Sequence, residues 1–221
     1  MYFTYKSFKK FCKENIPVLI LIPIITMRLF AEEKKNGTDV LLYTMPYSMK
    51  SAVIGKFLAA FALQVLMLVC LFSHMIVTVI LSGYISPATW GAILAYLVLA
   101  ALFISVGMLT SAMTENQIMS AVVCFVILLV MSMLSNIAES ISEVVKSLLK
   151  ITHLFGLSDS AIYSVGDWIR DAITWFDPYS KTEGFTSGVF KIVPIFFCLS
   201  FTFVFVFITY RVLEKKRWSQ N

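Results

Sequence analysis

The stretch TMRLFAEEKKNGTDVLLYTMP, residues 26–46, determines how the chain is organised. It carries six charged side chains, yet strongly apolar segments precede and follow it. Asn36-Gly37 provides a turn, and Pro46 ends any helix because the residue before a proline avoids helical geometry. A short charged segment with its own turn and helix signals predicts a folded elbow between two membrane helices, at residues 31–50.

The composition of the whole chain is typical of a membrane protein. Of its 221 residues, 59% are hydrophobic and 14% are charged, whereas soluble domains have about 25% charged residues. The net charge of +5 does not indicate a nucleic-acid partner, because the basic residues flank apolar blocks instead of forming a stripe. The four cysteines form no CxxC pair, so we expect neither a disulfide framework nor a metal site.

Four apolar blocks are long enough to cross a bilayer, which takes about 20 residues. They cover roughly residues 57–82, 90–110, 118–136 and 192–210. A fifth block, residues 16–30, is shorter and contains two prolines. It lacks the cleavage site of a signal peptide, so we expect a partial or complete span. The predicted fold is all-α: a single polytopic membrane helix bundle over residues 1–221, with about five transmembrane helices.

Residues 137–189 form a polar segment with two amphipathic helical patterns. In the first pattern, apolar side chains share one helical face opposite charged ones: Ile137, Ile141, Val144, Val145, Leu148 and Leu149 against Glu139, Glu143, Lys146 and Lys150. The second pattern places Ile162, Val165, Ile169, Ile173 and Phe176 on one face. These helices either lie at the bilayer surface or cover the end of the bundle, and the sequence leaves both readings open.

The distribution of Lys and Arg predicts the orientation. The loop from Arg28 to Lys56 has five of them and the tail 211–218 has four, which places both in the cytoplasm by the positive-inside rule. The hairpin 112–117 is then also cytoplasmic, and residues 137–189 are extracytoplasmic. Lys56 would snorkel from the inner end of its helix. The four lysines in the first 15 residues disagree with this topology, unless residues 1–30 form a re-entrant element or a preceding helix is missing.

Local signals also predict contacts within the elbow and the hairpin. Thr38 is placed to cap a short amphipathic helix, and Arg28 is placed to pair with Glu32 or Glu33 on the adjoining turn. In the hairpin TENQ, the side chain of Thr114 is expected to accept from the backbone of Gln117 in a capping box. From the residues alone, the elbow suits either transmission of force to a cytoplasmic partner or a helix resting on the headgroups.

The segment PIITMRLFAEEKKNGTDVLLYTMPYSMKSAVIGKFLAA, residues 23–60, resembles the signature region of ABC-2 type transporter permeases, in the branch with gliding-motility and multidrug-type exporter permeases. The matching positions are Thr26, Met27, Arg28, Phe30, Glu32, Glu33, Gly37, Thr38, Leu41, Leu42, Pro46, Gly55 and Lys56. Residues 107–125, 177–197 and 213–218 are similar to later parts of the same family, so the resemblance covers most of residues 16–218.

The resemblance implies a permease that works as a pair, with itself or a sister chain, above two ATP-binding subunits. The elbow would receive the force of ATP-driven closure, and its ATPase-coupling residues would be Arg28, Glu32, Glu33, Gly37, Thr38, Leu41, Leu42, Pro46, Gly55 and Lys56, with Thr114, Glu115, Asn116 and Gln117 in the cytoplasmic hairpin. ATP and magnesium would reside on the partner, because this chain has no Walker A loop. The family has six spans, and this sequence lacks an obvious first one. The alternative is therefore a truncated or non-transporting anchor or sensor subunit.

Few polar residues occur in the predicted spans. Gln64, His74 and Asn136 are the candidates for a substrate path, although a lone histidine equally serves as a hydrogen bond to a neighbouring helix. An intramembrane enzyme would need a catalytic dyad or paired aspartates in the spans. His74 has no such partner in the sequence, so we expect no catalytic residues, and the substrate cannot be read from the sequence.

Overall fold

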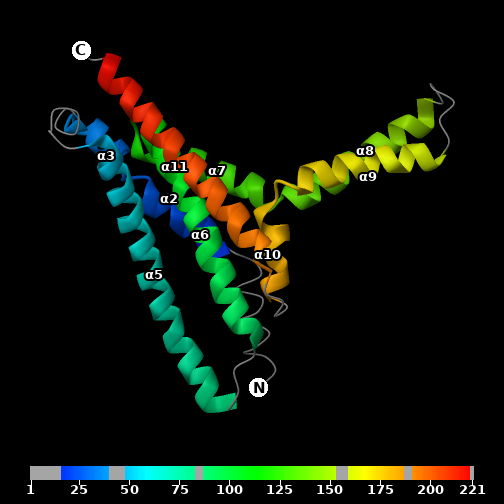
Figure 1. The fold of residues 1–221 in the computed structure, drawn as a ribbon, viewed down its shortest axis with the longest axis horizontal. Helices are drawn as coiled ribbons and strands as arrows, with labels where there is room; N and C mark the ends of the chain where they lie inside the picture. The colour runs from blue at the N-terminus through cyan, green and yellow to red at the C-terminus, as the bar shows by residue number, and fades with distance from the viewer. Residues whose placement is uncertain (1–15, 40–47, 83–86, 153–158, 187–190, 220–221) are drawn as a thin grey trace.

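The computed structural model describes residues 16–39, 48–82, 87–152, 159–186 and 191–219. Within these ranges every regular element is an α-helix (Figure 1). The helices are α2 (Ile16–Thr26), α3 (Ala31–Lys35), α5 (Met49–Ser82), α6 (Pro87–Met113), α7 (Gln117–Ser132), α8 (Leu134–Thr152), α9 (Asp159–Thr174), α10 (Pro178–Thr186) and α11 (Val193–Ser219). The predicted all-α class is confirmed.

Three helices in the described part of the chain are long and apolar enough to cross a membrane, in α5, α6 and α11. A fourth span results if α7 and α8, which are bent by 59° at their junction, count as one. The sequence predicted about five transmembrane helices. The count differs at α2, because its 11 described residues are fewer than the roughly 20 that a helix needs to cross a bilayer.

Helix α6 is the centre of the bundle, and α2, α5, α7, α10 and α11 all pack against it. Its C-terminal half is almost entirely buried. Small residues let the neighbouring backbones approach closely, as at Gly107, where the side chain of Thr26 from α2 occupies the space of a Cβ. The packing of α2 thus depends on the absence of a side chain on α6.

Helices α3, α5, α6 and α11 meet at one end of the bundle (Figure 1). Their shared core contains Phe30, Met49, Val53, Met108, Ala112 and Leu213. Helix α5 runs from this end to the opposite end, and α6 returns antiparallel to it. The elbow, the start of α5 and the end of α11 therefore lie on the same side of the bundle.

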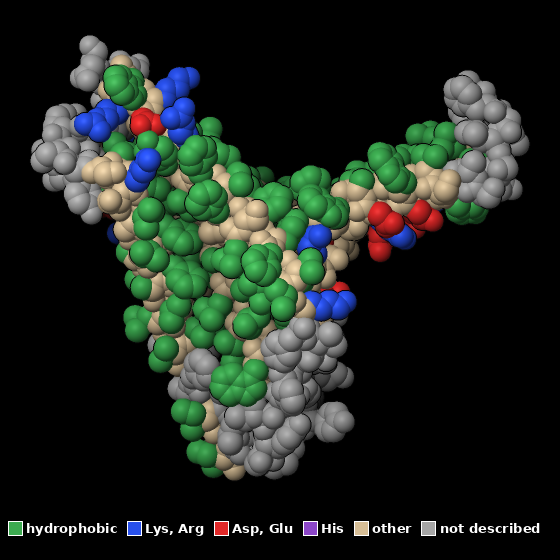
Figure 2. Space-filling model, viewed as in Figure 1, with side chains coloured by type: hydrophobic (Ala, Val, Ile, Leu, Met, Phe, Trp, Pro, Cys, Tyr) green, Lys and Arg blue, Asp and Glu red, His purple; other side chains and the backbone are tan. Residues whose placement is uncertain are grey.

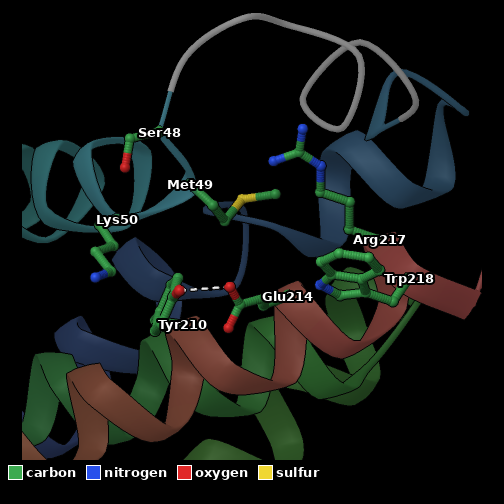
Figure 3. Close-up of a pocket in the computed structure, with 7 residues that line it drawn as sticks. All are labelled: Ser48, Met49, Lys50, Tyr210, Glu214, Arg217 and Trp218. Carbon is green, nitrogen blue, oxygen red and sulfur yellow. Dashed lines mark hydrogen bonds between the residues drawn. The ribbon is translucent and has the colours of Figure 1, made fainter.

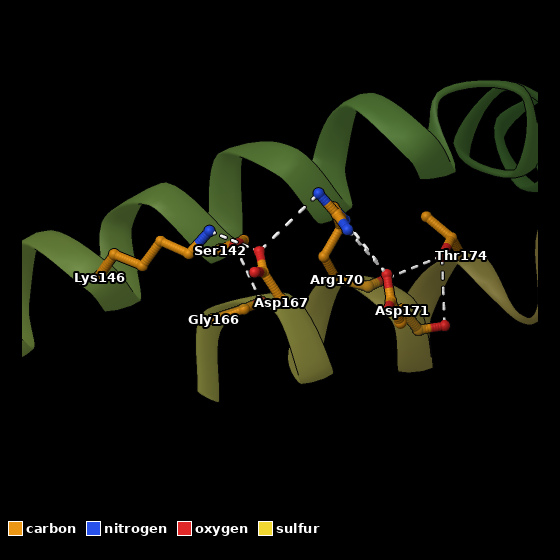
Figure 4. Close-up of polar contacts among 7 residues, drawn as sticks. All are labelled: Ser142, Lys146, Gly166, Asp167, Arg170, Asp171 and Thr174. Atoms are coloured by element: carbon orange, nitrogen blue, oxygen red, sulfur yellow. Dashed lines mark hydrogen bonds and ion pairs between the residues drawn. The ribbon is translucent and has the colours of Figure 1, made fainter. Parts of the chain in front are cut away.

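Helices α8 and α9 pack against each other and project sideways from the bundle (Figure 1). The hydroxyl of Ser142 donates to the carbonyl of Gly166 at 2.8 Å, and Lys146 Nζ lies 2.7 Å from Asp167 Oδ1 (Figure 4). The hydrogen bond from Lys146 holds the pKa of Asp167 below its usual value. Both predicted amphipathic helices exist, but α8 keeps apolar side chains such as Val144 and Leu148 exposed, so the pair does not cover the end of the bundle.

The Gly107–Thr26 contact predicts an unusual response to a glycine-to-alanine change. In a helix interior this change stabilises by about 1 kcal/mol through propensity alone. At Gly107 the new methyl group would overlap Thr26, so Gly107→Ala should instead destabilise by about 1–3 kcal/mol, as overpacking does. Thermal unfolding of the purified protein measures the effect.

Gly55→Ala is the matched control, because Gly55 also lies in a helix but nothing approaches its Cβ position within 4 Å. Its melting temperature should rise or stay constant. Equal stabilisation by both changes would contradict the proposed packing of α2 on α6.

Candidate coupling site

The chain breaks its helical path between α2 and α3, and this break creates the elbow. Thr26 ends α2, its hydroxyl donating to the Ile22 carbonyl at 2.8 Å. Residues 27–30 then form turns before α3 begins at Ala31. The side chain of Phe30 and the whole of Ala31 are buried, so the first turn of α3 lies inside the protein.

Ser111 of α6 satisfies the backbone exposed by this break. Its hydroxyl oxygen accepts from the backbone N–H of Phe30 at 3.0 Å and of Ala31 at 3.1 Å. The same hydroxyl lies 3.3 Å from the carbonyl of Met27, to which it donates. The first amides of a helix have no partner within it, so this buried serine acts as the cap of α3 from another helix.

Lys56 of α5 fixes the opposite side of the elbow. Its ammonium donates to the Leu29 carbonyl at 2.5 Å, lies 2.5 Å from Glu33 Oε1 and stands 4.3 Å from the centre of the Phe30 ring. The prediction that Lys56 snorkels from the inner end of its helix stays a prediction; in the structure its ammonium contacts a free carbonyl and a carboxylate of the elbow. Glu33 is used in this contact, and the predicted pair with Arg28 is absent among the described residues, where Arg28 is exposed.

Lys34 joins the elbow to the end of α6. Its ammonium donates to the carbonyls of Ala112 and Thr114, the latter at 3.3 Å. Burial, together with the nearby charge of Lys216, lowers the pKa of Lys34 to about 8. The carbonyls at the C-terminus of α6 offset part of the cost of this half-buried cation, because they form the negative end of the helix dipole.

Gly37 ends α3 in the left-handed region, with φ of +67°. Its N–H donates to Lys34 O at 3.1 Å, and the N–H of Thr38 donates to Glu33 O at 2.9 Å, which is the usual role of a glycine after a helix. The hydroxyl of Thr38 also donates to Glu33 O, at 3.2 Å. Thr38 thus closes α3, and the helix that the sequence predicted it to cap continues into residues 40–47, outside the described residues.

The hairpin between α6 and α7 lies beside the elbow. Thr114 donates to Thr110 O at 2.8 Å, so the predicted capping box is wrong. Asn116 is the cap instead, its side chain accepting from Ile118 N at 3.0 Å. Glu115 Oε1 lies 3.9 Å from Lys216 Nζ of α11. Gln117 is the first residue of α7.

The structure brings most of the predicted coupling residues to one end of the bundle. Glu33, Gly37, Thr38 and Lys56 take part in the contacts above, whereas Glu32 is half-buried without an ion-pair partner in the described ranges. Gly55 faces open space. Leu41, Leu42 and Pro46 lie outside the described residues.

Sequence reasoning missed Ser111 and Lys34. Their contacts join residues about 80 positions apart, so no local sequence pattern indicates them.

The residues predicted for a substrate path do not form one group. Gln64 is buried between α5 and α6, where its side-chain amide donates to the hydroxyl of Tyr96 while its carbonyl oxygen has no hydrogen-bond partner. Asn136 is exposed on α8. The side chain of His74 lies outside the described residues. Among the described residues, no group of three or more His, Cys, Asp or Glu side chains is placed to hold a metal ion.

Comparison with known families gives one match. The family model described as ABC-2 family transporter protein matches residues 14–218. Neither a curated protein nor a solved structure matches the chain.

Removal of the Ser111 hydroxyl should loosen the elbow. In Ser111→Ala, two buried N–H groups lose their acceptor, and each unsatisfied group costs about 1–3 kcal/mol. We expect a lower melting temperature and faster hydrogen exchange at Phe30 and Ala31, measured by mass spectrometry on the purified protein.

Ser105→Ala is the control, because the buried hydroxyl of Ser105 donates only within its own helix, to Leu102 O at 2.6 Å. It should leave exchange at residues 30 and 31 unchanged. If both variants behave alike, Ser111 does not cap α3.

Proposed function

Because the chain belongs to the ABC-2 transporter family, we propose that it is the permease subunit of an exporter driven by ATP hydrolysis in a separate subunit. The permease acts as a pair, with a second copy or a related chain. An ATP-binding subunit docks at the elbow and at the hairpin 114–116, which lie side by side. The substrate crosses between the two permeases, and this chain contributes no catalytic residue.

The observation that supports this proposal is the attachment of α3 to three other helices. Ser111 and the carbonyls of α6 hold it on one side, Lys56 of α5 holds it on the other, and Phe30 packs into the core shared with α11. A force applied to α3 would therefore be transmitted directly to α5, α6 and α11. A helix that only rested on headgroups would not need these buried contacts.

The contacts within the chain support different roles for the two glutamates of α3. Glu33 is engaged by Lys56 within the chain, whereas Glu32 and the exposed Lys35 have no ion-pair partner in the described ranges. We assign Glu32 to the docking surface and Glu33 to the internal support of α3. Family resemblance alone placed both glutamates in the same role.

The orientation follows from the charges at this end of the bundle. Figure 2 shows Lys and Arg side chains gathered around α3 and the end of α11, a mainly apolar surface along the bundle below them, and further basic side chains lower on the bundle beside the α8–α9 arm. The positive-inside rule puts this end in the cytoplasm, where ATP is available. The α8–α9 pair and the end of α5 near Ser82 are then extracytoplasmic or in the outer leaflet.

Charge reversal distinguishes the proposed roles of Glu32 and Glu33. Glu32→Lys should reduce co-purification with the ATP-binding subunit of the same transporter several-fold, because attraction at the interface becomes repulsion. Glu33→Lys and Lys56→Glu should each lower stability, and the double exchange should restore association and part of the stability, because a glutamate at position 56 cannot donate to the Leu29 carbonyl. Pull-down after co-expression, with membrane insertion checked separately, measures this.

Two outcomes contradict the assignment. If the Glu32→Lys variant binds the ATPase as strongly as the unaltered chain, Glu32 does not lie in the interface. A double exchange that restores stability but not association places Glu33 at the interface as well. Association without any stimulation of ATP hydrolysis would favour an anchor or sensor subunit over a transporter.

The orientation is tested by thiol labelling in intact cells, in a chain whose four cysteines are replaced. Lys35→Cys should react with a membrane-impermeant maleimide only after the membrane is opened. Trp168→Cys, at an exposed position of α9, should react from outside in intact cells. The reverse pattern would overturn the orientation.

A further inference from the structure

A pocket of about 330 Å³ lies between the start of α5 and the end of α11 (Figure 3). Lys50 lines it from α5, and Tyr210, Glu214, Arg217 and Trp218 line it from α11. The pocket sits at the same end of the bundle as the elbow, but its lining includes no residue of α3. It is therefore separate from the coupling contacts described above.

Among the described residues that line the pocket, two are basic and one is acidic. Its one acidic residue, Glu214, already accepts from the Tyr210 hydroxyl at 2.5 Å and from Arg211 at 3.0 Å. Lys50 stands 5.5 Å from the centre of the Tyr210 ring, and neither it nor Arg217 has an ion-pair partner among the described residues. Two exposed cations beside a satisfied carboxylate favour an anionic ligand.

An apolar surface continues from the pocket toward the middle of the bundle. Ile54 and Leu58 follow Lys50 at four-residue intervals on α5 and are 50% and 56% exposed, so all three share one helical face. On α11, Phe207 is 52% exposed and its ring centre lies 6.2 Å from that of Tyr210. The two helices together present a cationic, aromatic end followed by an apolar strip.

We propose that this pocket binds the phosphate headgroup of an anionic phospholipid, whose acyl chains lie along Ile54, Leu58 and Phe207. Basic pockets between membrane helices bind such headgroups on the cytoplasmic side, and the planar guanidinium of Arg217 matches the geometry of a phosphate. Trp218 and Tyr210 are of the residue types that favour the level of the headgroups. A ligand with a polar head and an apolar tail matches both halves of the site, which a free anion does not.

The lipid also has a structural effect in this arrangement. A headgroup between Lys50 and Arg217 bridges α5 and α11 at the end where both helices support the elbow. Binding to the folded state raises its apparent stability with the logarithm of the lipid concentration, once that concentration exceeds the Kd. The proposal needs only that these helices reach the membrane surface and is independent of the ATP-binding partner.

The test uses the full chain purified in a neutral detergent. Phosphatidylglycerol, but not phosphatidylcholine with the same acyl chains, should remain bound in native mass spectra and raise the melting temperature. Lys50→Gln combined with Arg217→Gln should weaken binding of phosphatidylglycerol roughly 10- to 30-fold, given the contribution of each basic residue near an anionic surface. Lys50→Arg should retain binding.

Lys35→Gln combined with Lys215→Gln is the matched control, since it removes two exposed positive charges outside the pocket and should leave binding unchanged. Equal loss in the control, or equal binding of both lipids, would overturn the proposal. So would full stabilisation by inorganic phosphate alone, which would indicate a site for a free anion. Unchanged lipid binding by the pocket variant with loss of the ATP-binding subunit would make the pocket a protein-docking surface.

Discussion

The need to satisfy backbone hydrogen bonds inside an apolar bundle governs the arrangement of this end of the protein. Between α2 and α3 the helical ladder stops, and the N–H groups of Phe30 and Ala31 are buried without an acceptor in their own segment. Unpaired polar groups are costly where water is absent. The hydroxyl of Ser111 in α6 accepts hydrogen bonds from both N–H groups. As a result, α3 cannot move away from α6 without leaving these two N–H groups unpaired.

The cations at this end divide into two kinds according to the partner they find. Lys34 and Lys56 turn inward, where free carbonyls of α6 and of the α2–α3 turn hold them. Lys50 and Arg217 face outward into a pocket with no spare acidic group. The first kind fixes the elbow to the bundle and the second leaves charge available to a ligand, although the sequence shows only a uniform excess of basic residues.

Patterns that act over one or two helical turns were sufficient to predict most elements. The apolar blocks formed α5, α6, α7 and α11, and the amphipathic faces of α8 and α9 were recognised. Two expected pairings failed. Glu33 pairs with Lys56 of another helix and not with Arg28. Thr114 donates to Thr110 of α6, while Asn116 caps α7. Helical spacing shows which side chains share a face, but not that Ser111 meets a turn some 80 residues earlier. The block at residues 16–30 was expected to form a partial or complete span, and in the structure its helix ends at Thr26, where the chain turns toward α3.

The junction of α7 and α8 has a mechanical consequence. A single residue, Met133, separates the two helices at their 59° bend, and α8 extends 19 residues beyond it, roughly 28 Å at about 1.5 Å per residue. A rotation of about 10° at this hinge would sweep the far tip of the arm through roughly 5 Å, by the same helix length. Because α7 begins at the hairpin beside the elbow, a small tilt of α7 at that end would be amplified into a larger displacement at the tip of the α8–α9 arm.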